Sequence, residues 1–238
     1  MVHLEIQDRV AILTLDNDAK HNAYTVAMLR DLRDHMRELR DDADVGCVLI
    51  HGAGRSFCSG SDTTEVKSVT PAQAAERAHL DYSTKQAITD SPKITIAAVH
   101  GYCLGGGLEL ATACDLRVVD PDSTFGLPEM ALGSLPGSGG IQRLLEIVGR
   151  GRIMDWMLRS RRFDVAEAQQ AGMVTIVSEP GAVLEEALDL ARSLSDRNAV
   201  AVEVAKMLLD PTSRRSAATD EAIHGIAAAS VRQARPLG

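Results

Sequence analysis

The chain has 238 residues, of which 45% are hydrophobic and 24% are charged. This composition is ordinary for a globular protein, and the length suffices for a substantial core without disulfides or metals. The formal net charge of −8 argues against a nucleic acid or an anionic membrane as the main partner. The N-terminal sequence MVHLEIQDRV is unlike a secretory signal, and no apolar run reaches the ~18 residues of a membrane helix. We therefore expect a cytoplasmic protein.

Cysteine and histidine spacing gives no sign of a metal site or a redox motif. No two of the four cysteines form a CxxC pair, and the histidines include no HExxH. Each cysteine lies in or beside an apolar run, where a buried free thiol is expected. The cysteines are Cys47, Cys58, Cys103 and Cys114. We expect neither a metal nor a redox cofactor.

The N-terminal quarter predicts a hairpin, a helix and a buried strand. Residues 3–16 hold two short β-rich runs split by polar residues, as in a β-hairpin. Apolar residues recur at helical spacing over 25–40, where Thr25 is suited to be the N-cap. CVLIHG at 47–52 is typical of a buried strand, and 52–70 is rich in Gly, Ser and Thr, as expected of a loop.

The middle of the chain predicts alternating helices and strands around a glycine turn. We expect a helix over 72–89 and a strand over 94–99. GYCLGGG at 101–107 predicts a turn, because three consecutive glycines suit neither a helix nor a strand. A helix should begin at Leu108, and LRVVD and STFG predict two further short strands.

The C-terminal part is predicted to be mainly helical. Beyond Gly137 we expect helices, apart from a strand near 173–177, and three Ala-rich amphipathic helices from residue 181. Strands that alternate with helices indicate an α/β domain. We therefore predict an α/β core over 1–180 and a helical segment over 181–238.

The usual glycine and serine motifs are incomplete in this chain. HGAGRSF has Phe57 where a dinucleotide-binding fingerprint needs Gly or Ala, and no GK[ST] follows any glycine loop. GRSFC at 54–58 lacks the last glycine of a nucleophile elbow. These gaps argue against nucleotide binding and against a serine hydrolase.

Two other glycine segments are candidates for backbone donors to a developing oxyanion. Gly105, Gly106 and Gly107 precede a helix, so N–H groups and the positive helix end could approach a ligand there. In SFCSGSD, Gly60 leaves the N–H of Ser61 similarly unobstructed. Each such donor is typically worth about 10²–10³ in rate. Taken alone, either segment is better interpreted as a tight turn between elements.

Two glutamates in apolar surroundings favour acid–base chemistry. Glu109 lies in GGGLELATA and Glu129 in FGLPEMALG. Burying a carboxylate costs several kcal/mol unless it is paired or protonated, and burial raises its pKa toward neutrality. A salt bridge to Arg117 or Arg143 is the structural alternative. For the pair, general acid/base catalysis is the better interpretation.

These residues resemble the crotonase family, which comprises enoyl-CoA hydratases and isomerases. The resemblance is strongest over AAVHGYCLGGGLELATACDLRVVDPDSTFGLPEMALGSLPGSGGIQRL at 97–144, with support at 21–25, 52–62 and 161–177. It implies an α/β fold built as a spiral of repeated ββα units with a helical C-terminal part. It also implies that 181–238 serves as a trimerisation or lid segment in a homotrimer or hexamer.

Carried over by position, the resemblance assigns roles to residues of this chain. The oxyanion hole would be the N–H groups of Ser61 and Gly106, and the two catalytic acids would be Glu109 and Glu129. The remaining substrate-binding positions would be Gly60, Asp62, Gly105, Gly107, Pro136 and Gly137. The substrate would be an acyl-CoA thioester, with coenzyme A as the carrier and no other cofactor.

Because both glutamates are present, the resemblance implies an enoyl-CoA hydratase that adds water to a trans-2-enoyl thioester. The alternatives are isomerisation, thioester hydrolysis or carbon–carbon cleavage on the same scaffold, and a non-catalytic acyl-CoA-binding or scaffold protein. Hydratases commonly have Ala at the position of Ser61. They often carry a lysine that contacts the CoA phosphates where this chain has Thr63 and Thr64, and the next lysine is Lys67.

Overall fold

Two β-sheets organise the chain in the computed structural model, which describes residues 1–66 and 70–209 together with 219, 223 and 225. The large sheet has the strand order β1-β2-β3-β4-β6-β9, and the small sheet has the order β5-β7-β8. The large-sheet strands are β1 (Val2–Gln7), β2 (Val10–Leu15), β3 (Cys47–Gly52), β4 (Ile94–Val99), β6 (Leu116–Val119) and β9 (Ile176–Val177). The small-sheet strands are β5 (Tyr102–Leu104), β7 (Thr124–Gly126) and β8 (Arg162–Phe163).

The large sheet begins with the predicted hairpin. β1 and β2 pair antiparallel in the register Val2↔Leu15 to Gln7↔Val10. Asp8 and Arg9 form the two-residue turn with positive φ values of 50° and 62°, which matches the right-handed strand twist. All later neighbours in this sheet are parallel. The inner strands are therefore buried on both faces, as their unbroken apolar runs predict.

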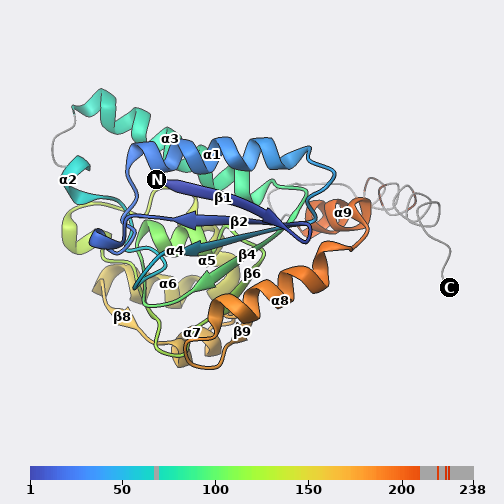
Figure 1. Cartoon of the computed structure of the whole chain (residues 1–238). Coiled ribbons are helices and arrows are strands. Elements are labelled where there is room, and N and C mark those ends of the chain that lie inside the picture. Colours follow the sequence, from blue (N-terminus) through green and yellow to red (C-terminus); the bar gives the residue numbers. More distant parts are fainter. Residues whose placement is uncertain (67–69, 210–218, 220–222, 224, 226–238) are drawn as a thin grey trace.

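Helices cover both faces of the large sheet (Figure 1). On one face, α1 (Val26–Arg40) packs against α3 (Pro71–Thr89), and on the other α8 (Val183–Ser195) packs across β2, β3, β4 and β6. Thr25 caps α1 by accepting a 3.2 Å hydrogen bond from Met28 N, as predicted. The other helical elements are η1 (Asp18–Lys20), α2 (Thr63–Val66), α4 (Gly106–Ala111), η2 (Glu129–Leu132), α5 (Gly140–Val148), α6 (Arg150–Arg159), α7 (Val165–Gln170) and α9 (Ala199–Leu209).

Repeated ββα units generate the spiral. β4 lies in the large sheet, β5 in the small sheet, and α4 follows; β6, β7 and α5 repeat this order. Each unit thus crosses from one sheet to the other before its helix returns the chain. The expected α/β spiral with a helical C-terminal part is confirmed, and the division at residues 180 and 181 stays a prediction.

An aromatic stack ties α6 to the small sheet. The ring of Trp156 lies 3.9 Å from that of Phe163, and Phe163 stacks at 5.6 Å on Phe125. The indole N–H of Trp156 donates a 2.8 Å hydrogen bond to Glu167 Oε1. Trp156 and Phe125 are both buried, so these three rings supply much of the core under the small sheet.

The sequence prediction is wrong for two segments, and it missed one strand. The expected loop at 52–70 contains the short helix α2, and β8 was not expected. The expected turn at 101–107 is mostly β5 and the start of α4, because only Gly101 and Gly105 of this segment have positive φ values, of 55° and 52°. The strand expected near 173–177 is confirmed over Ile176–Val177, and the last of the three C-terminal helices lies outside the described residues.

The four cysteines are buried free thiols, as predicted. Burial raises the pKa values of Cys47, Cys58 and Cys114 to about 12. Among the helices that the structure describes, none is both long enough and apolar enough to cross a membrane.

Candidate active site

The predicted glycine turn sits where β5 of the small sheet passes into α4. Gly105 N donates a 2.8 Å hydrogen bond to Gly126 O, which fixes the turn to β7. A Cβ at Gly105 would lie 2.7 Å from Glu129 Oε1, and one at Gly107 would lie 2.2 Å from Cys58 O. Glycine is therefore required here by close packing as well as by conformation.

The second predicted donor segment lies beside this turn. Tyr24 N donates to Gly60 O at 2.8 Å, and Asp62 N donates to Tyr24 O at 3.0 Å. A Cβ at Gly60 would come within 3.3 Å of Gly106 N, so the two segments are in contact. Within the described residues, neither Ser61 N nor Gly106 N donates a hydrogen bond. Two neighbouring backbone N–H groups are thus left to bind an external acceptor.

Glu109 is held on the first turn of α4 by the loop that precedes α5. It is 2% exposed, and its Oε1 accepts hydrogen bonds from Ser138 N at 3.0 Å and Gly140 N at 3.1 Å. Ser138 Oγ lies 3.3 Å from Oε2. Among the described residues Glu109 forms no ion pair, so the salt-bridge alternative to Arg117 or Arg143 is not seen there. Its partners are neutral donors.

Glu129, unlike Glu109, has a carboxylate oxygen that accepts no hydrogen bond within the described residues. It begins the 3₁₀ turn η2, its Oε1 faces the Gly105 turn, and its Oε2 is buried without a hydrogen-bond partner among the described residues. Burial raises the pKa of Glu129 to about 7, and the nearby charge of Glu109 adds to this increase. A carboxyl group with this pKa is half-protonated near neutral pH, which suits a proton donor.

The other predicted substrate-binding residues lie on the two loops around these glutamates. Pro136 is buried and Gly137 is exposed in the loop before α5, and the next residue, Ser138, is the one that contacts Glu109. The carboxylate of Asp62 accepts from Lys20 Nζ at 2.7 Å. Hydrogen bonds from Lys20 and Thr64 lower the pKa of Asp62 to about 2.

Sequence reasoning missed a buried polar cluster next to Glu109, formed by Tyr24, Asp81, Lys85 and Ser138. Lys85 Nζ donates to Tyr24 Oη at 3.1 Å, to Ser138 Oγ at 3.0 Å and to Asp81 Oδ1. Burial, reinforced by the charges of Asp81 and Glu109, raises the pKa of Tyr24 well above its ordinary value. The available signal was helical spacing, because Asp81 and Lys85 share the face of α3 that carries the apolar Ile88.

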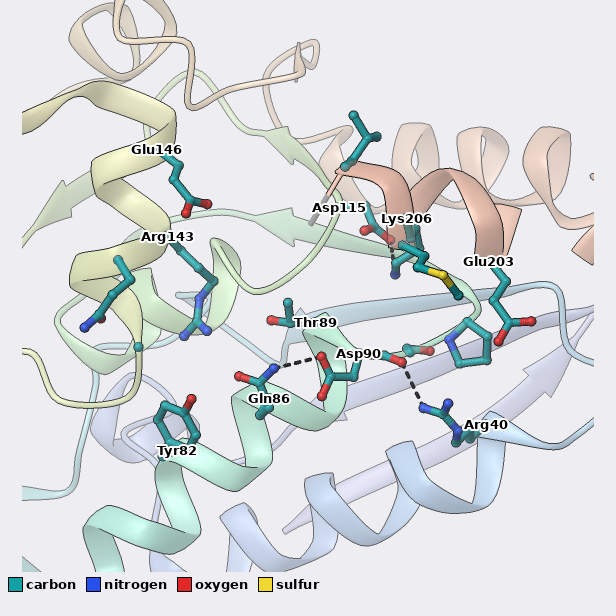
Figure 2. Close-up of a pocket in the computed structure, with 16 residues that line it drawn as sticks. Arg40, Tyr82, Gln86, Thr89, Asp90, Asp115, Arg143, Glu146, Glu203 and Lys206 are labelled. Atoms are coloured by element: carbon teal, nitrogen blue, oxygen red, sulfur yellow. Dashed lines mark hydrogen bonds and ion pairs between the residues drawn. The ribbon is translucent and has the colours of Figure 1, made fainter. Parts of the chain in front are cut away.

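A large open cavity is lined by residues that include Tyr82, Arg143 and Lys206 (Figure 2). It measures about 540 Å³ between α3, α5 and α9, and Gly139 and Arg143 belong to its wall. Arg143 donates a 2.5 Å hydrogen bond to Ser138 O, which connects the cavity wall to the loop that holds Glu109. Neither glutamate and neither predicted oxyanion donor lines the cavity, so it is separate from the candidate site.

Within the described part of the chain, no group of three His, Cys, Asp or Glu side chains could hold a metal ion. The polar groups at the candidate site are two carboxylates, two backbone donors and the Lys85 cluster.

Comparisons with known proteins agree on one family. A family model described as enoyl-CoA hydratase/isomerase matches residues 5–228. The 2,3-dehydroadipyl-CoA hydratase of Escherichia coli (strain K12) is 37% identical over 205 residues, which cover 85% of this chain and 79% of that protein. The short-chain-enoyl-CoA hydratase of Clostridium acetobutylicum is 32% identical over 210 residues, which cover 88% and 80%.

Solved structures agree with the sequence relatives. The crystal structure of an enoyl-CoA hydratase from Bacillus anthracis matches with a TM-score of 0.91 at 27% identity, covering 98% of this chain and 91% of that one. The two sheets and their ββα units thus define an α/β protein of the crotonase fold. The chain belongs to the enoyl-CoA hydratase/isomerase family, also called the crotonase family.

Proposed function

We propose that this protein is an enoyl-CoA hydratase that adds water across the double bond of a trans-2-enoyl-CoA thioester. The observation that carries the proposal is the presence, in one site, of two glutamates with different hydrogen bonding and of two backbone N–H groups that donate no hydrogen bond within the described residues. Glu109 accepts hydrogen bonds from loop donors, whereas Glu129 has a raised pKa and a buried oxygen without a partner in the described chain. An acid and a base in one site are what the addition of water requires.

The proposed reaction uses each group once. Glu109 removes a proton from water as the water oxygen bonds to the β-carbon, and the double-bond electrons move to the thioester oxygen. The N–H groups of Ser61 and Gly106 stabilise the resulting enolate oxygen. As the carbonyl re-forms, Glu129 donates its proton to the α-carbon. Proton exchange with solvent then restores both glutamates, so that one water has been added.

The test is an assay with crotonyl-CoA that follows the loss of the conjugated enoyl-thioester absorbance, with identification of the product. Formation of 3-hydroxybutyryl-CoA would support the proposal. An isomer, a free acid or a cleaved product from other acyl-CoA substrates would instead identify a different reaction on this scaffold. The absence of turnover with every acyl-CoA would favour a binding protein.

The pH dependence should report the protonation of Glu129. Its raised pKa of about 7 means that the proton-donating form prevails below that value and is lost as pH rises through it. We expect kcat/KM for crotonyl-CoA to fall on the alkaline side of about 7, with a slope of about one decade per pH unit. Initial rates across the pH range, with circular dichroism as the folding control, would check this. A profile that stays flat through this range would contradict the assignment.

Lys20 offers a cation for the phosphates of coenzyme A. Its Nζ lies 3.0 Å from Thr64 Oγ1 and is half-exposed, so it reaches the position where hydratases often carry a lysine. We expect Lys20→Met to raise KM for crotonyl-CoA about tenfold, which corresponds to the loss of one charged hydrogen bond. The matched measurement uses crotonyl-pantetheine, which lacks the nucleotide phosphates. An equal increase in KM for both substrates would show that Lys20 does not bind phosphate.

The assembly and location belong to the same proposal. We propose a cytoplasmic homotrimer, or a hexamer of paired trimers, in which 181–238 contributes to assembly or covers the site. Light scattering of the purified full chain would give the mass of the assembly directly. A monomer at assay concentration would overturn this part of the proposal.

A further inference from the structure

A buried lysine lies close to both catalytic glutamates without contacting either one. The Lys85 side chain is 1% exposed, and its positive charge lowers the pKa of Glu129 against the larger effect of burial. All three donors of its ammonium group are used, by Tyr24 Oη, Ser138 Oγ and Asp81 Oδ1. Asp81 Oδ2 in turn accepts from Tyr24 Oη at 3.0 Å and from Ser138 Oγ at 2.5 Å.

This cluster reaches the reacting groups through two neutral side chains. Ser138 bonds Lys85 and Asp81 with its hydroxyl, while its backbone N–H donates to Glu109 Oε1 at 3.0 Å. Tyr24 Oη packs against the other half of the site, since a Cβ at Gly106 would lie 1.8 Å from it. The cluster therefore contacts both the loop that holds Glu109 and the predicted oxyanion donor.

A purely structural role explains this arrangement poorly. A buried ion pair is often no more stabilising than well-packed apolar side chains of the same volume. The position lies among apolar residues, because Leu15, Met28 and Leu110 line the small cavity next to Tyr24 and Lys85. The Lys85–Asp81 pair is nevertheless buried at this position and hydrogen-bonded to Ser138 in the loop that holds Glu109, which points to a role in the reaction.

We propose that Lys85 is a positioning residue for the hydration reaction, which it serves by fixing Ser138 and thereby the carboxylate of Glu109. This inference rests on the proposed hydratase function. Lys85 and Asp81 orient the Ser138 hydroxyl from one side, which leaves the Ser138 N–H aligned with Glu109 Oε1. Glu109 is then held in one orientation toward the attacking water.

Two reactions that share this site should respond differently to the loss of Lys85. Hydration of crotonyl-CoA needs both Glu109 and Glu129. Exchange of the α-proton of butyryl-CoA in D₂O needs only the oxyanion donors and Glu129, which takes the proton from the α-carbon and returns a deuteron after exchange with solvent. Loss of Lys85 should therefore impair hydration and spare exchange, whereas general damage to the site would impair both.

The experiment compares Lys85→Met with the parent in both reactions. We expect kcat for hydration to fall about 10–100-fold, with KM and the α-proton exchange rate within about twofold of the parent. Because Lys85→Met leaves Asp81 unpaired, the double variant Lys85→Met/Asp81→Asn removes both charges and serves if the single variant unfolds. Gln86→Met is the matched control, since Gln86 follows Lys85 on α3 and bonds Asp90 instead.

Ser138→Ala tests whether Lys85 acts on Glu109 through the Ser138 hydroxyl. It should reproduce the selective loss of hydration, and Ser138→Ala/Lys85→Met should lose little more than either single variant. Hydration at the parent rate in the Lys85 variants, or equal loss of hydration and exchange, would overturn the positioning role alone. A parent protein that hydrates no enoyl-CoA would overturn the proposed function and this role with it.

Discussion

Replacing Glu129 with glutamine is expected to lower kcat for crotonyl-CoA hydration by about 10²–10⁴-fold, the usual contribution of one general acid or base. Gln is nearly isosteric with the protonated carboxyl, so it should fit beside Gly105 without distorting the turn. Its amide N–H groups are not acidic enough to protonate the α-carbon. The decrease in rate above pH 7 should disappear with the carboxyl that causes it. Steady-state kinetics with crotonyl-CoA measure both effects.

Glu5→Gln is the matched control for this variant. Glu5 is exposed on β1, an edge strand of the large sheet, and should tolerate the change without effect on kcat. Glu109→Gln is expected to show a loss of similar size, since water must still be deprotonated. If both glutamine variants hydrate at the parent rate, the two-carboxylate mechanism is wrong.

Gly106→Ala should produce the second large loss, of about 10²–10³-fold in kcat, by disturbing one backbone donor of the oxyanion hole. The added methyl group would lie 1.8 Å from Tyr24 Oη, so either the tyrosine or the start of α4 must move. Movement at the start of α4 changes where the Gly106 N–H points, whereas Glu129, which lies on η2, remains in place. Kinetics with crotonyl-CoA, together with the melting temperature, would separate lost catalysis from lost stability.

Gly151→Ala provides the comparison for that experiment. Gly151 lies in the first turn of α6, and a Cβ there would meet no atom within 4 Å. Alanine is also the better helix former, so this variant should keep its kcat and its stability. If Gly106→Ala keeps the parent kcat although its crystal structure shows the start of α4 displaced, the Gly106 N–H is not a donor in the reaction.

Local patterning predicts most elements of this fold because the elements are long and periodic. The helix from Val26 to Arg40 and the hairpin before it follow from 3.6-residue and two-residue spacing. The errors fall on short elements that tertiary contacts create. β8 has two residues and exists because it pairs with β7, and β5 continues to Leu104 because it pairs with the same strand.

The candidate site likewise contains residues that the sequence predicts and residues that only tertiary contacts reveal. The glycines and the two glutamates are visible in sequence because a carboxylate in an apolar context is unusual. The partners that set their surroundings come from distant segments, so no local pattern identifies them. Ser138 is 29 residues from Glu109, and Lys85 is 61 residues from Tyr24. Only the fold brings α3 and the loop before α5 to the start of α4.

The aromatic stack under the small sheet gives the protein a built-in optical reporter. Trp156 is the one tryptophan of the chain, it is fully buried, and α6 on which it lies contacts η2, where Glu129 begins. All indole emission therefore comes from a single site, on the helix that contacts η2. Its wavelength should shift to the red when the small sheet unfolds, and its intensity offers a label-free signal for ligands that move η2.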